Sequence, residues 1–261
     1  MTNLHIHPTA VVSPSAQIGA GVEIGPYCVV EGPCVLEAGV ILGAHVVIRP
    51  YVRLGAGVRV SSHAVLGGEP QDLSFKGQET WLEVGERTVI REGVTLHRST
   101  REDRPTRIGA DCYLMAYSHV AHDCQVEDGV ILTNAVNLAG HVEVGERAVL
   151  GGMTGVHQFV RIGAYAMVGG ASKVSKDILP FALVDGRPAR HYRLNTIGLR
   201  RNGISGERYK ALEQAFRLLR KGHRPEGLPQ TEEVAQLRAF LEAPSKRGIA
   251  AFVHPDARWE E

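Results

Sequence analysis

The sequence predicts a parallel β-helix built from six-residue repeats, followed by a small α-helical region at the C-terminal end. Three observations lead to this prediction. A large aliphatic residue recurs every six positions, and a small or branched residue follows each one four positions later. Glycine is common directly after the aliphatic residue, and the chain holds 30 glycines with only 6% aromatic residues. This composition is typical of a repeat architecture.

The six-residue register begins at Ile6 and ends at Val174, and only Asp72, Gln78 and Glu102 interrupt it. A period of six is too short for a helical repeat, so it describes one short strand plus a turn. Three such units wind into one coil, and successive coils stack at the usual strand spacing of about 4.8 Å. The glycines suit the corners of the coil, where the backbone needs freedom.

Two interruptions of the register predict loops that project from the coil. They cover residues 67–81 and 98–107, and they place acidic or amide side chains at positions that would otherwise point into a dry core. Loops of this kind often build the binding face of a solenoid, although either one could be a solvated surface excursion.

The cysteines and the histidines fall on opposite sides of this register. The four cysteines all occupy the small inward position, so we expect buried apolar side chains rather than disulfides or a metal site. Five histidines miss both inward positions and should face out of the coil. The cysteines are Cys28, Cys34, Cys112 and Cys124, and the histidines are His97, His119, His122, His141 and His157.

Three of these histidines should also form a column. His122, His141 and His157 follow one another at intervals close to the 18 residues of one coil. They should lie on one face of the solenoid and span about 10 Å at strand spacing. One outward histidine is usually a solvated surface residue, but a stacked column favours a catalytic or binding site.

After Pro180 the hexads stop, and two helical patterns follow at residues 206–221 and 231–242, with Thr231 as a candidate N-cap. The sequence therefore predicts a β-helix domain over residues 1–185 and a helical domain over residues 186–261.

Charge is concentrated in one part of the chain. The formal net charge is only +1, which argues against global attraction to nucleic acid. Residues 186–224, however, carry eleven Lys or Arg and two Glu, a local balance of +9. A solvated helix face explains part of this, but the density favours an acidic partner or phosphate groups. The start of the chain has no apolar signal region and no run approaches 18 apolar residues, so we expect a cytoplasmic protein.

Six motifs, taken in order, make the chain resemble the UDP-N-acetylglucosamine acyltransferases that begin lipid A synthesis. This resemblance extends from the first coil to the last helix. It implies that the β-helix is left-handed, that the protein is a homotrimer, and that the reaction uses no cofactor or metal. The motifs are PQDL at 70–73, VTLHRST at 94–100, HVAHDC at 119–124, LAGHV at 138–142, GGMTGVHQF at 151–159 and NTIGLRRNG at 195–203.

The same resemblance implies the reaction and the residues that perform it. A 3-hydroxyacyl chain would pass from an acidic acyl carrier protein to the 3-position of UDP-N-acetylglucosamine. His122 matches the general base, Asp123 the residue that orients or polarises it, and the backbone N–H of Gly140 the oxyanion donor. The positions that match substrate contacts are Gln71, Asp72, His97, His119, His141, Gln158, Asn195 and Arg201, while Gly170 matches the position that sets acyl-chain depth.

The chain departs from this family pattern in one place. A lysine usually follows the QDL run, whereas this chain has Ser74 there and Lys76 two positions later. The glycine at position 170 leaves the acyl groove open, which implies a longer acyl chain.

Three alternatives stand beside this interpretation. The related N-acyltransferase of the same pathway carries an additional N-terminal domain, for which hexads that begin at Ile6 leave no room. A γ-class carbonic anhydrase is also a hexapeptide trimer and would bind zinc through His97, His119 and His122. A non-catalytic scaffold explains the coils but not the histidine column. The sequence leaves open whether the acceptor is a hydroxyl or an amine.

Overall fold

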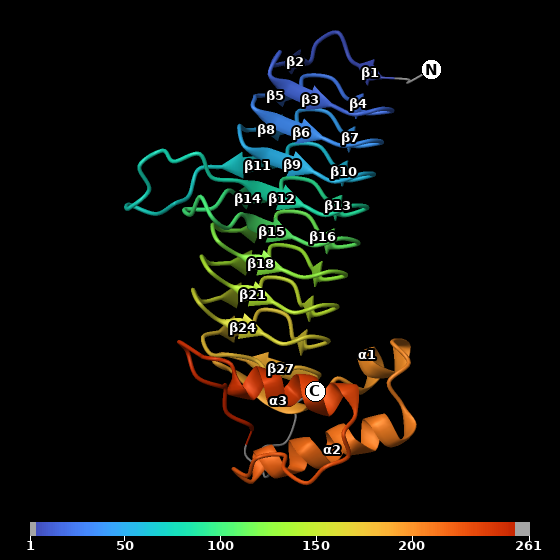
Figure 1. Ribbon diagram of the computed structural model, residues 1–261, viewed down its shortest axis with the longest axis vertical. Coiled ribbons are helices and arrows are strands. Elements are labelled where there is room, and N and C mark those ends of the chain that lie inside the picture. The colour runs from blue at the N-terminus through green and yellow to red at the C-terminus, as the bar shows by residue number, and fades with distance from the viewer. Residues whose placement is uncertain (1–3, 254–261) are drawn as a thin grey trace.

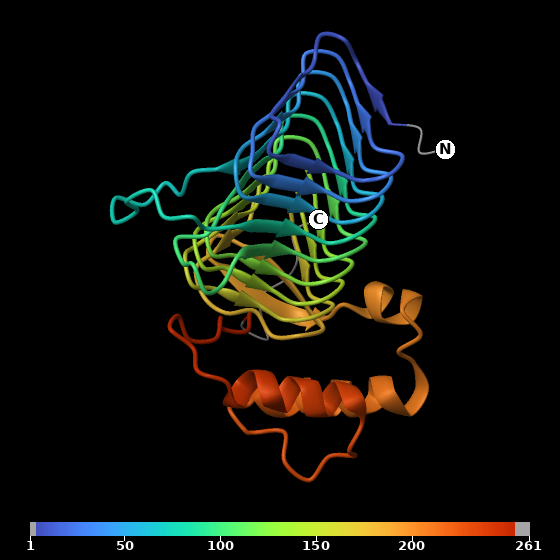
Figure 2. The ribbon, with the colours of Figure 1, turned by 45° about the horizontal axis from the view of Figure 1, so that its top comes forward.

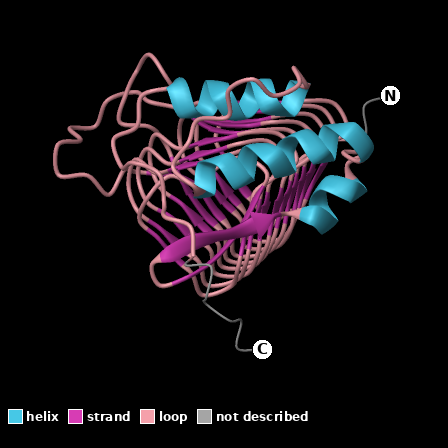
Figure 3. Ribbon diagram, turned by 90° about the horizontal axis from the view of Figure 1, so that it is seen from below, coloured by secondary structure: helices cyan, strands magenta, loops and turns pink. Residues whose placement is uncertain are grey.

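A computed structural model describes residues 4–253 of the chain. Three parallel sheets wrap around one axis to form an elongated prism, and helices pack at its C-terminal end (Figure 1). Each coil passes through sheets A, B and C in turn. Seen along the prism, the coils superimpose and the helices lie over their end (Figure 3). The predicted left-handed parallel β-helix with a small helical C-terminal part is confirmed.

Sheet A is the longest of the three. It contains β1 (His5–Ile6), β4 (Glu23–Ile24), β7 (Ile41–Leu42), β10 (Arg59–Val60), β13 (Val89–Ile90), β16 (Tyr113–Leu114), β19 (Ile131–Leu132), β22 (Val149–Leu150), β25 (Met167–Val168), β27 (Ala182–Gly186) and β28 (Ala189–Leu194).

Sheets B and C consist of parallel strands only. Sheet B contains β2 (Val11–Val12), β5 (Val29–Val30), β8 (Val47–Ile48), β11 (Val65–Gly68), β14 (Thr95–His97), β17 (His119–Val120), β20 (Asn137–Leu138), β23 (Gly155–Val156) and β26 (Lys173–Val174). Sheet C contains β3 (Ala16–Ile18), β6 (Cys34–Leu36), β9 (Val52–Leu54), β12 (Leu82–Val84), β15 (Thr106–Ile108), β18 (Gln125–Val126), β21 (Glu143–Val144) and β24 (Arg161–Ile162).

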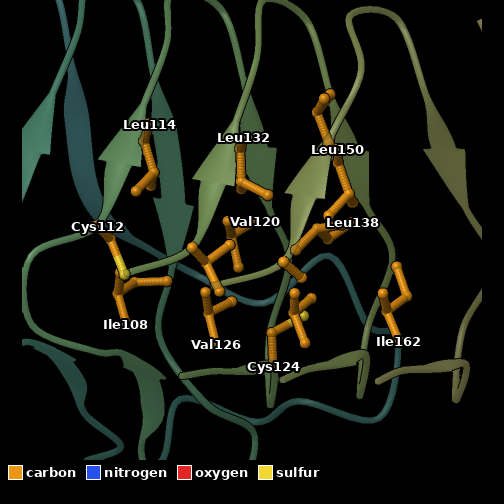
Figure 4. Packing of buried hydrophobic residues seen from close by; sticks show 14 of the residues in the cluster. Ile108, Cys112, Leu114, Val120, Cys124, Val126, Leu132, Leu138, Leu150 and Ile162 are labelled. Carbon is orange, nitrogen blue, oxygen red and sulfur yellow. The ribbon is translucent and has the colours of Figure 1, made fainter. Parts of the chain in front are cut away.

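The strand register matches the repeat in the sequence. His119 pairs with Asn137 and Asn137 with Gly155, so one coil takes 18 residues, or three hexads. The large inward residues form columns, for example Leu114, Leu132 and Leu150 along sheet A (Figure 4). This stacking makes a mainly apolar core, in which the small inward position also accepts buried hydroxyl residues such as Thr88, Ser118 and Thr154.

All four cysteines are buried and free, as predicted. The Cys124 thiol is completely shielded and donates a hydrogen bond to the carbonyl of Ala139 at 3.2 Å. Burial raises the pKa of Cys124 to about 12, so this thiol is unreactive near neutral pH.

Both predicted interruptions leave the coil as loops. The first runs from the end of β11 at Gly68 to Leu82 and projects far from the prism (teal in Figures 1 and 2). The second begins after His97 and ends sooner than expected, because Thr106 and Arg107 already belong to β15.

The C-terminal region continues sheet A before it becomes helical. β27 pairs with β25 in parallel, and β28 returns antiparallel to β27, so the expected domain boundary at 185/186 falls inside this hairpin. The helices that follow are α1 (Thr196–Arg201), α2 (Gly206–Arg220) and α3 (Glu232–Glu242).

The two longer helices confirm the helical patterns in the sequence. Thr231 caps α3, because its hydroxyl accepts a hydrogen bond from the Val234 N–H at 3.3 Å. The short α1 was not predicted. None of the helices in the described part of the chain is long and apolar enough to cross a membrane.

Candidate active site

A pocket of about 830 Å³ lies against sheet B, beneath the projecting loop of residues 69–81. Half of the site residues expected from the sequence line it, although they come from three successive coils and a loop. Those six are Gln71, Asp72, His119, His122, Gly140 and Gln158.

His122 lies at the corner between β17 and β18, and its orientation is set by the next residue. Its Nδ1 hydrogen bonds the Asp123 carboxylate at 2.6 Å. Asp123 adopts a positive φ of 61°, and the residues at the same corner of the next two coils, His141 and Phe159, also have a positive φ. Because Nδ1 donates to a carboxylate, Nε2 is the nitrogen that carries the free lone pair.

The carboxylate of Asp123 is itself held by the loop that follows β14. The Ser99 hydroxyl donates to Oδ1 at 2.5 Å, and the Thr100 hydroxyl donates to Oδ2 at 2.7 Å. The Asp123 N–H donates to the hydroxyl of Thr106 at 2.8 Å. Burial alone would raise the pKa of Asp123, but the hydrogen bonds from His122, Ser99 and Thr100 outweigh it and hold this pKa well below its usual range. The carboxylate is therefore ionised and fixed.

The predicted histidine column is only partly correct. The His122 and His141 rings meet edge to face with their centroids 5.2 Å apart. The next ring, however, is Phe159, which stacks on His141 at 4.6 Å. His157 lines the pocket on the sheet B side instead, because an interval of 16 residues shifts it by two positions within the coil.

Gly140 stands one coil beyond His122 and touches its ring. A Cβ atom at this position would lie 2.5 Å from Cε1 and 2.6 Å from Nε2 of His122. The close approach therefore requires glycine. The Gly140 N–H has no hydrogen-bond acceptor among residues 4–253, so it is available to a ligand in the pocket.

The projecting loop brings Asp72 over His122. Its Oδ2 lies 4.0 Å from Nε2 of His122, and its Oδ1 accepts hydrogen bonds from the backbone N–H and hydroxyl of Ser74 at 2.8 and 2.6 Å. Ser74 thus orients Asp72. Lys76 donates to the carbonyl of Leu73 at 3.1 Å and does not line the pocket.

The loop is fastened to the prism by Arg98, whose side chain is almost fully buried. Its guanidinium donates to the Gln78 carbonyl at 3.0 Å and to Glu69 at 3.3 Å. It also lies over the rings of Tyr51 and Phe75. Residues 98–100 therefore hold both the loop above the pocket and the carboxylate behind His122.

His97 and His119 face out of the coil, as predicted, but His97 is buried by the surrounding loops and His119 is half-buried. Burial lowers the pKa of His97 to about 4 and also lowers the pKa of His119. His119 Nδ1 bonds the Thr95 hydroxyl at 2.7 Å, whereas the buried Nδ1 of His97 has no partner among the described residues.

Three expected site residues lie away from this pocket. Asn195 and Arg201 line a separate pocket near α1, on the corner between sheets C and A. Asn195 caps α1 and donates to the Tyr165 carbonyl at 2.9 Å. Gly170 lies at the corner between sheets A and B, where a Cβ atom would come no closer than 3.4 Å to another atom.

Comparison with known proteins identifies the family. Residues 177–250 match domain 2 of UDP N-acetylglucosamine O-acyltransferase, and residues 105–140 match the bacterial transferase hexapeptide repeats. The acyl-[acyl-carrier-protein]–UDP-N-acetylglucosamine O-acyltransferase of Burkholderia orbicola is 54% identical over 239 residues, which cover 91% of this chain and 90% of that protein. The chain belongs to this O-acyltransferase family.

Further relatives agree along nearly the whole length. The O-acyltransferase of the same name from Verminephrobacter eiseniae is 49% identical and covers 94% of this chain and 98% of its own. The crystal structure of the Moraxella catarrhalis UDP-N-acetylglucosamine O-acyltransferase superimposes with a TM-score of 0.83 at 39% identity, over 94% of this chain and 99% of that one. The Bacteroides fragilis acyltransferase gives 0.88 at 34% identity, with the same coverage.

Membership of the O-acyltransferase family removes the carbonic anhydrase alternative. The structure also disagrees with the zinc trio considered for it. Among the described residues, the three potential ligand atoms that cluster within 4.8 Å come from His122, Asp123 and His141, not from His97, His119 and His122. Both oxygens of Asp123 are already engaged by hydroxyl and imidazole groups, which leaves this carboxylate little capacity for a cation.

Several residues of this O-acyltransferase site were not found from the sequence. Ser99 and Thr100 lie where the hexads are interrupted, and Thr106 lies in β15 within the stretch that was expected to be a loop. Arg98 and Phe159 were inside motifs that carried the resemblance but were given no role. The one signal present in the sequence was the adjacent pair of hydroxyl residues, Ser99 and Thr100, which follows His97 and Arg98 in the motif VTLHRST.

Proposed function

We propose that the chain transfers an acyl group from acyl carrier protein to the 3-hydroxyl of UDP-N-acetylglucosamine, the first step of lipid A synthesis, with His122 as general base. The observation that carries this proposal is the His122–Asp123 pair, which directs a free imidazole nitrogen into the pocket. The relatives are named O-acyltransferases, which favours an oxygen over an amine as the acceptor. The cytoplasmic location expected from the sequence stays a prediction.

The chemistry requires one proton to move twice. Nε2 of His122 takes the proton of the sugar hydroxyl as its oxygen attacks the thioester carbonyl carbon. The resulting imidazolium is stabilised by the ionised Asp123 behind it. When the C–S bond breaks, the same proton passes to the leaving thiolate of the carrier's arm, and the C–O ester bond is complete. Neither a metal nor a redox partner enters this balance.

The Gly140 N–H is our candidate for the oxyanion donor. It has no acceptor within the described chain and lies beside the His122 ring, so a carbonyl oxygen near Nε2 could receive it. A preorganised backbone donor of this kind typically contributes about 10²–10³-fold in rate.

We propose that a homotrimer completes the site, because Asn195 and Arg201 lie too far around the prism to meet His122 of the same chain. The outward residues of sheets A and B support contact between copies, since many are aliphatic, such as Val29, Val47, Ile131 and Val149. Those of sheet C are mostly charged or amide side chains, which suits a solvent-facing surface.

The basic segment of residues 186–224 is the proposed dock for the acidic carrier. A hollow between β28 and α2 contains Arg193, Arg217 and Arg220 with a single Glu213 among its charged lining residues. Positive charge at this end of the prism would steer the carrier toward the pocket. Gly170 is also part of this proposal: with no side chain at this position, the groove for the acyl chain stays open and admits a longer chain.

The decisive experiment measures turnover with purified protein. Acyl carrier thioesters of graded chain length, with and without a 3-hydroxyl, are offered with UDP-N-acetylglucosamine or its 3-amino analogue. Ester formation on the 3-hydroxyl is expected, and it should be fastest for one chain length. Exclusive amide formation on the analogue, or no transfer from any carrier thioester, would contradict the proposal.

A further inference from the structure

The segment that follows α3 returns to the prism and is held there by backbone hydrogen bonds. The Asp177 N–H donates to the Gly248 carbonyl at 2.8 Å, and the Ala250 N–H donates to the Asp177 carbonyl at 2.9 Å. Arg247 adds a bond from Nε to the Ser175 carbonyl at 3.2 Å. The residues before this contact therefore have a defined position against the lower coils.

This docking places Lys246 on the corner between sheets B and C, where His122 and Asp123 also lie. Its Nζ lies 4.0 Å from the centroid of the Phe159 ring, and Phe159 in turn stacks on His141 with the ring planes at 16°. Asp123, His141 and Phe159 occupy equivalent positions of three successive coils. Lys246 thus extends the stack that begins at the His122–Asp123 pair.

The ammonium of Lys246 is free to bind a ligand. The side chain is exposed, and it forms no ion pair or hydrogen bond with any residue between 4 and 253. An ammonium on an aromatic face keeps N–H donors directed away from the ring. Its charge also acts on the site: burial lowers the pKa of His141, the negative charge of Asp123 opposes this, and the charge of Lys246 adds to the lowering.

We propose that Lys246 is a further substrate-binding residue, which contacts the diphosphate of the bound sugar nucleotide. This inference rests on the proposed function. A sugar with its 3-hydroxyl at His122 has its anomeric carbon two ring positions away, beyond C2, and its diphosphate extends outward from that carbon. Along this corner, Phe159 lies two coils or about 10 Å beyond Asp123. A phosphate needs a cation at about this distance, and Lys246 supplies one.

The carrier's phosphopantetheine arm also contains a phosphate, so kinetics must separate the two sources. Lys246→Gln should raise the KM for UDP-N-acetylglucosamine by about five-fold, the scale of one exposed charge contact. The KM for the acyl carrier and kcat should stay unchanged. Lys246→Arg, which keeps the charge, should restore the KM to within about two-fold of the original value.

Lys176→Gln is the matched control, because Lys176 is also exposed, whereas among the described residues it makes no contact with the Phe159 ring of the kind that Lys246 makes. It removes the same charge and should leave both KM values unchanged. Calorimetric titration provides a readout that needs no turnover: Lys246→Gln should weaken binding of UDP-N-acetylglucosamine but not of uridine.

Three results would overturn the inference: a rise in the carrier KM alone, a loss of kcat without a change in KM, or an equal effect of Lys176→Gln. A wild-type protein that acylates no sugar nucleotide would instead refute the proposed function, so the two failures are distinct.

Discussion

Substitution of Gly140 by alanine tests whether the position of the His122 ring, rather than its mere presence, controls catalysis. The new methyl carbon would lie 2.5–2.6 Å from two ring atoms of His122, whereas carbon atoms in contact stay about 3.5–4.0 Å apart. The imidazole must therefore shift by about 1 Å, away from its hydrogen bond to Asp123. A displacement of this size typically costs about 10²-fold in rate.

The assay is kcat with saturating carrier thioester and sugar nucleotide. Gly140→Ala keeps the backbone N–H, so a loss of rate reports the displaced base and not a missing oxyanion donor. Gly152→Ala serves as the control, since the nearest atom to its Cβ would be the Asn134 carbonyl oxygen at 3.3 Å and neither residue lines the pocket. If correctly folded Gly140→Ala turned over within about two-fold of wild type, the ring contact would not control the base.

The remaining predictions address the base, the carrier and the stability of the fold. His122→Ala should lower kcat by about 10²–10⁴-fold. Cys124→Ala, which changes a buried residue two positions away, should cost about 1 kcal/mol of stability and little activity. A larger loss of kcat in correctly folded Cys124→Ala than in His122→Ala would refute the assignment of His122 as the base. Charge reversal at two or three arginines in residues 186–224 should raise the KM for the acyl carrier and reduce its salt dependence, and unchanged values would exclude this segment as the dock. His191 is buried and its pKa is lowered by burial to about 4, so the unfolded chain binds a proton that the folded chain refuses as pH falls from 6.5 to 4. Up to roughly 3 kcal/mol of folding free energy should disappear over that interval. The thermal midpoints of wild type and His191→Gln should therefore differ above pH 6.5 and approach each other below pH 4.

The fold could be predicted almost completely because the aliphatic residue of each hexad shows which of its side chains point into the core. One missing aliphatic residue, such as Glu102, is informative when the residues six positions away on both sides, Leu96 and Ile108, point inward. The same logic assigned the cysteines correctly, since a residue four positions after the aliphatic has only one direction available. No such repetition exists after Pro180, and α1 was therefore missed, while α2 and α3 were found from their own periodicity.

The site was harder to predict because its exposure depends on segments outside the register. Periodicity correctly placed His97 and His122 outside the coil, yet the loops that cover them make both side chains nearly inaccessible. Burial changes the chemistry around His122, because the buried carboxylate of Asp123 needs several hydrogen-bond donors to stay ionised. Ser99 and Thr100 are those donors, and they come from the very stretch where the hexads fail. The interruption therefore supplies the hydroxyl groups that fix Asp123 against His122, because the residues after β14 leave the coil and turn their side chains toward this carboxylate.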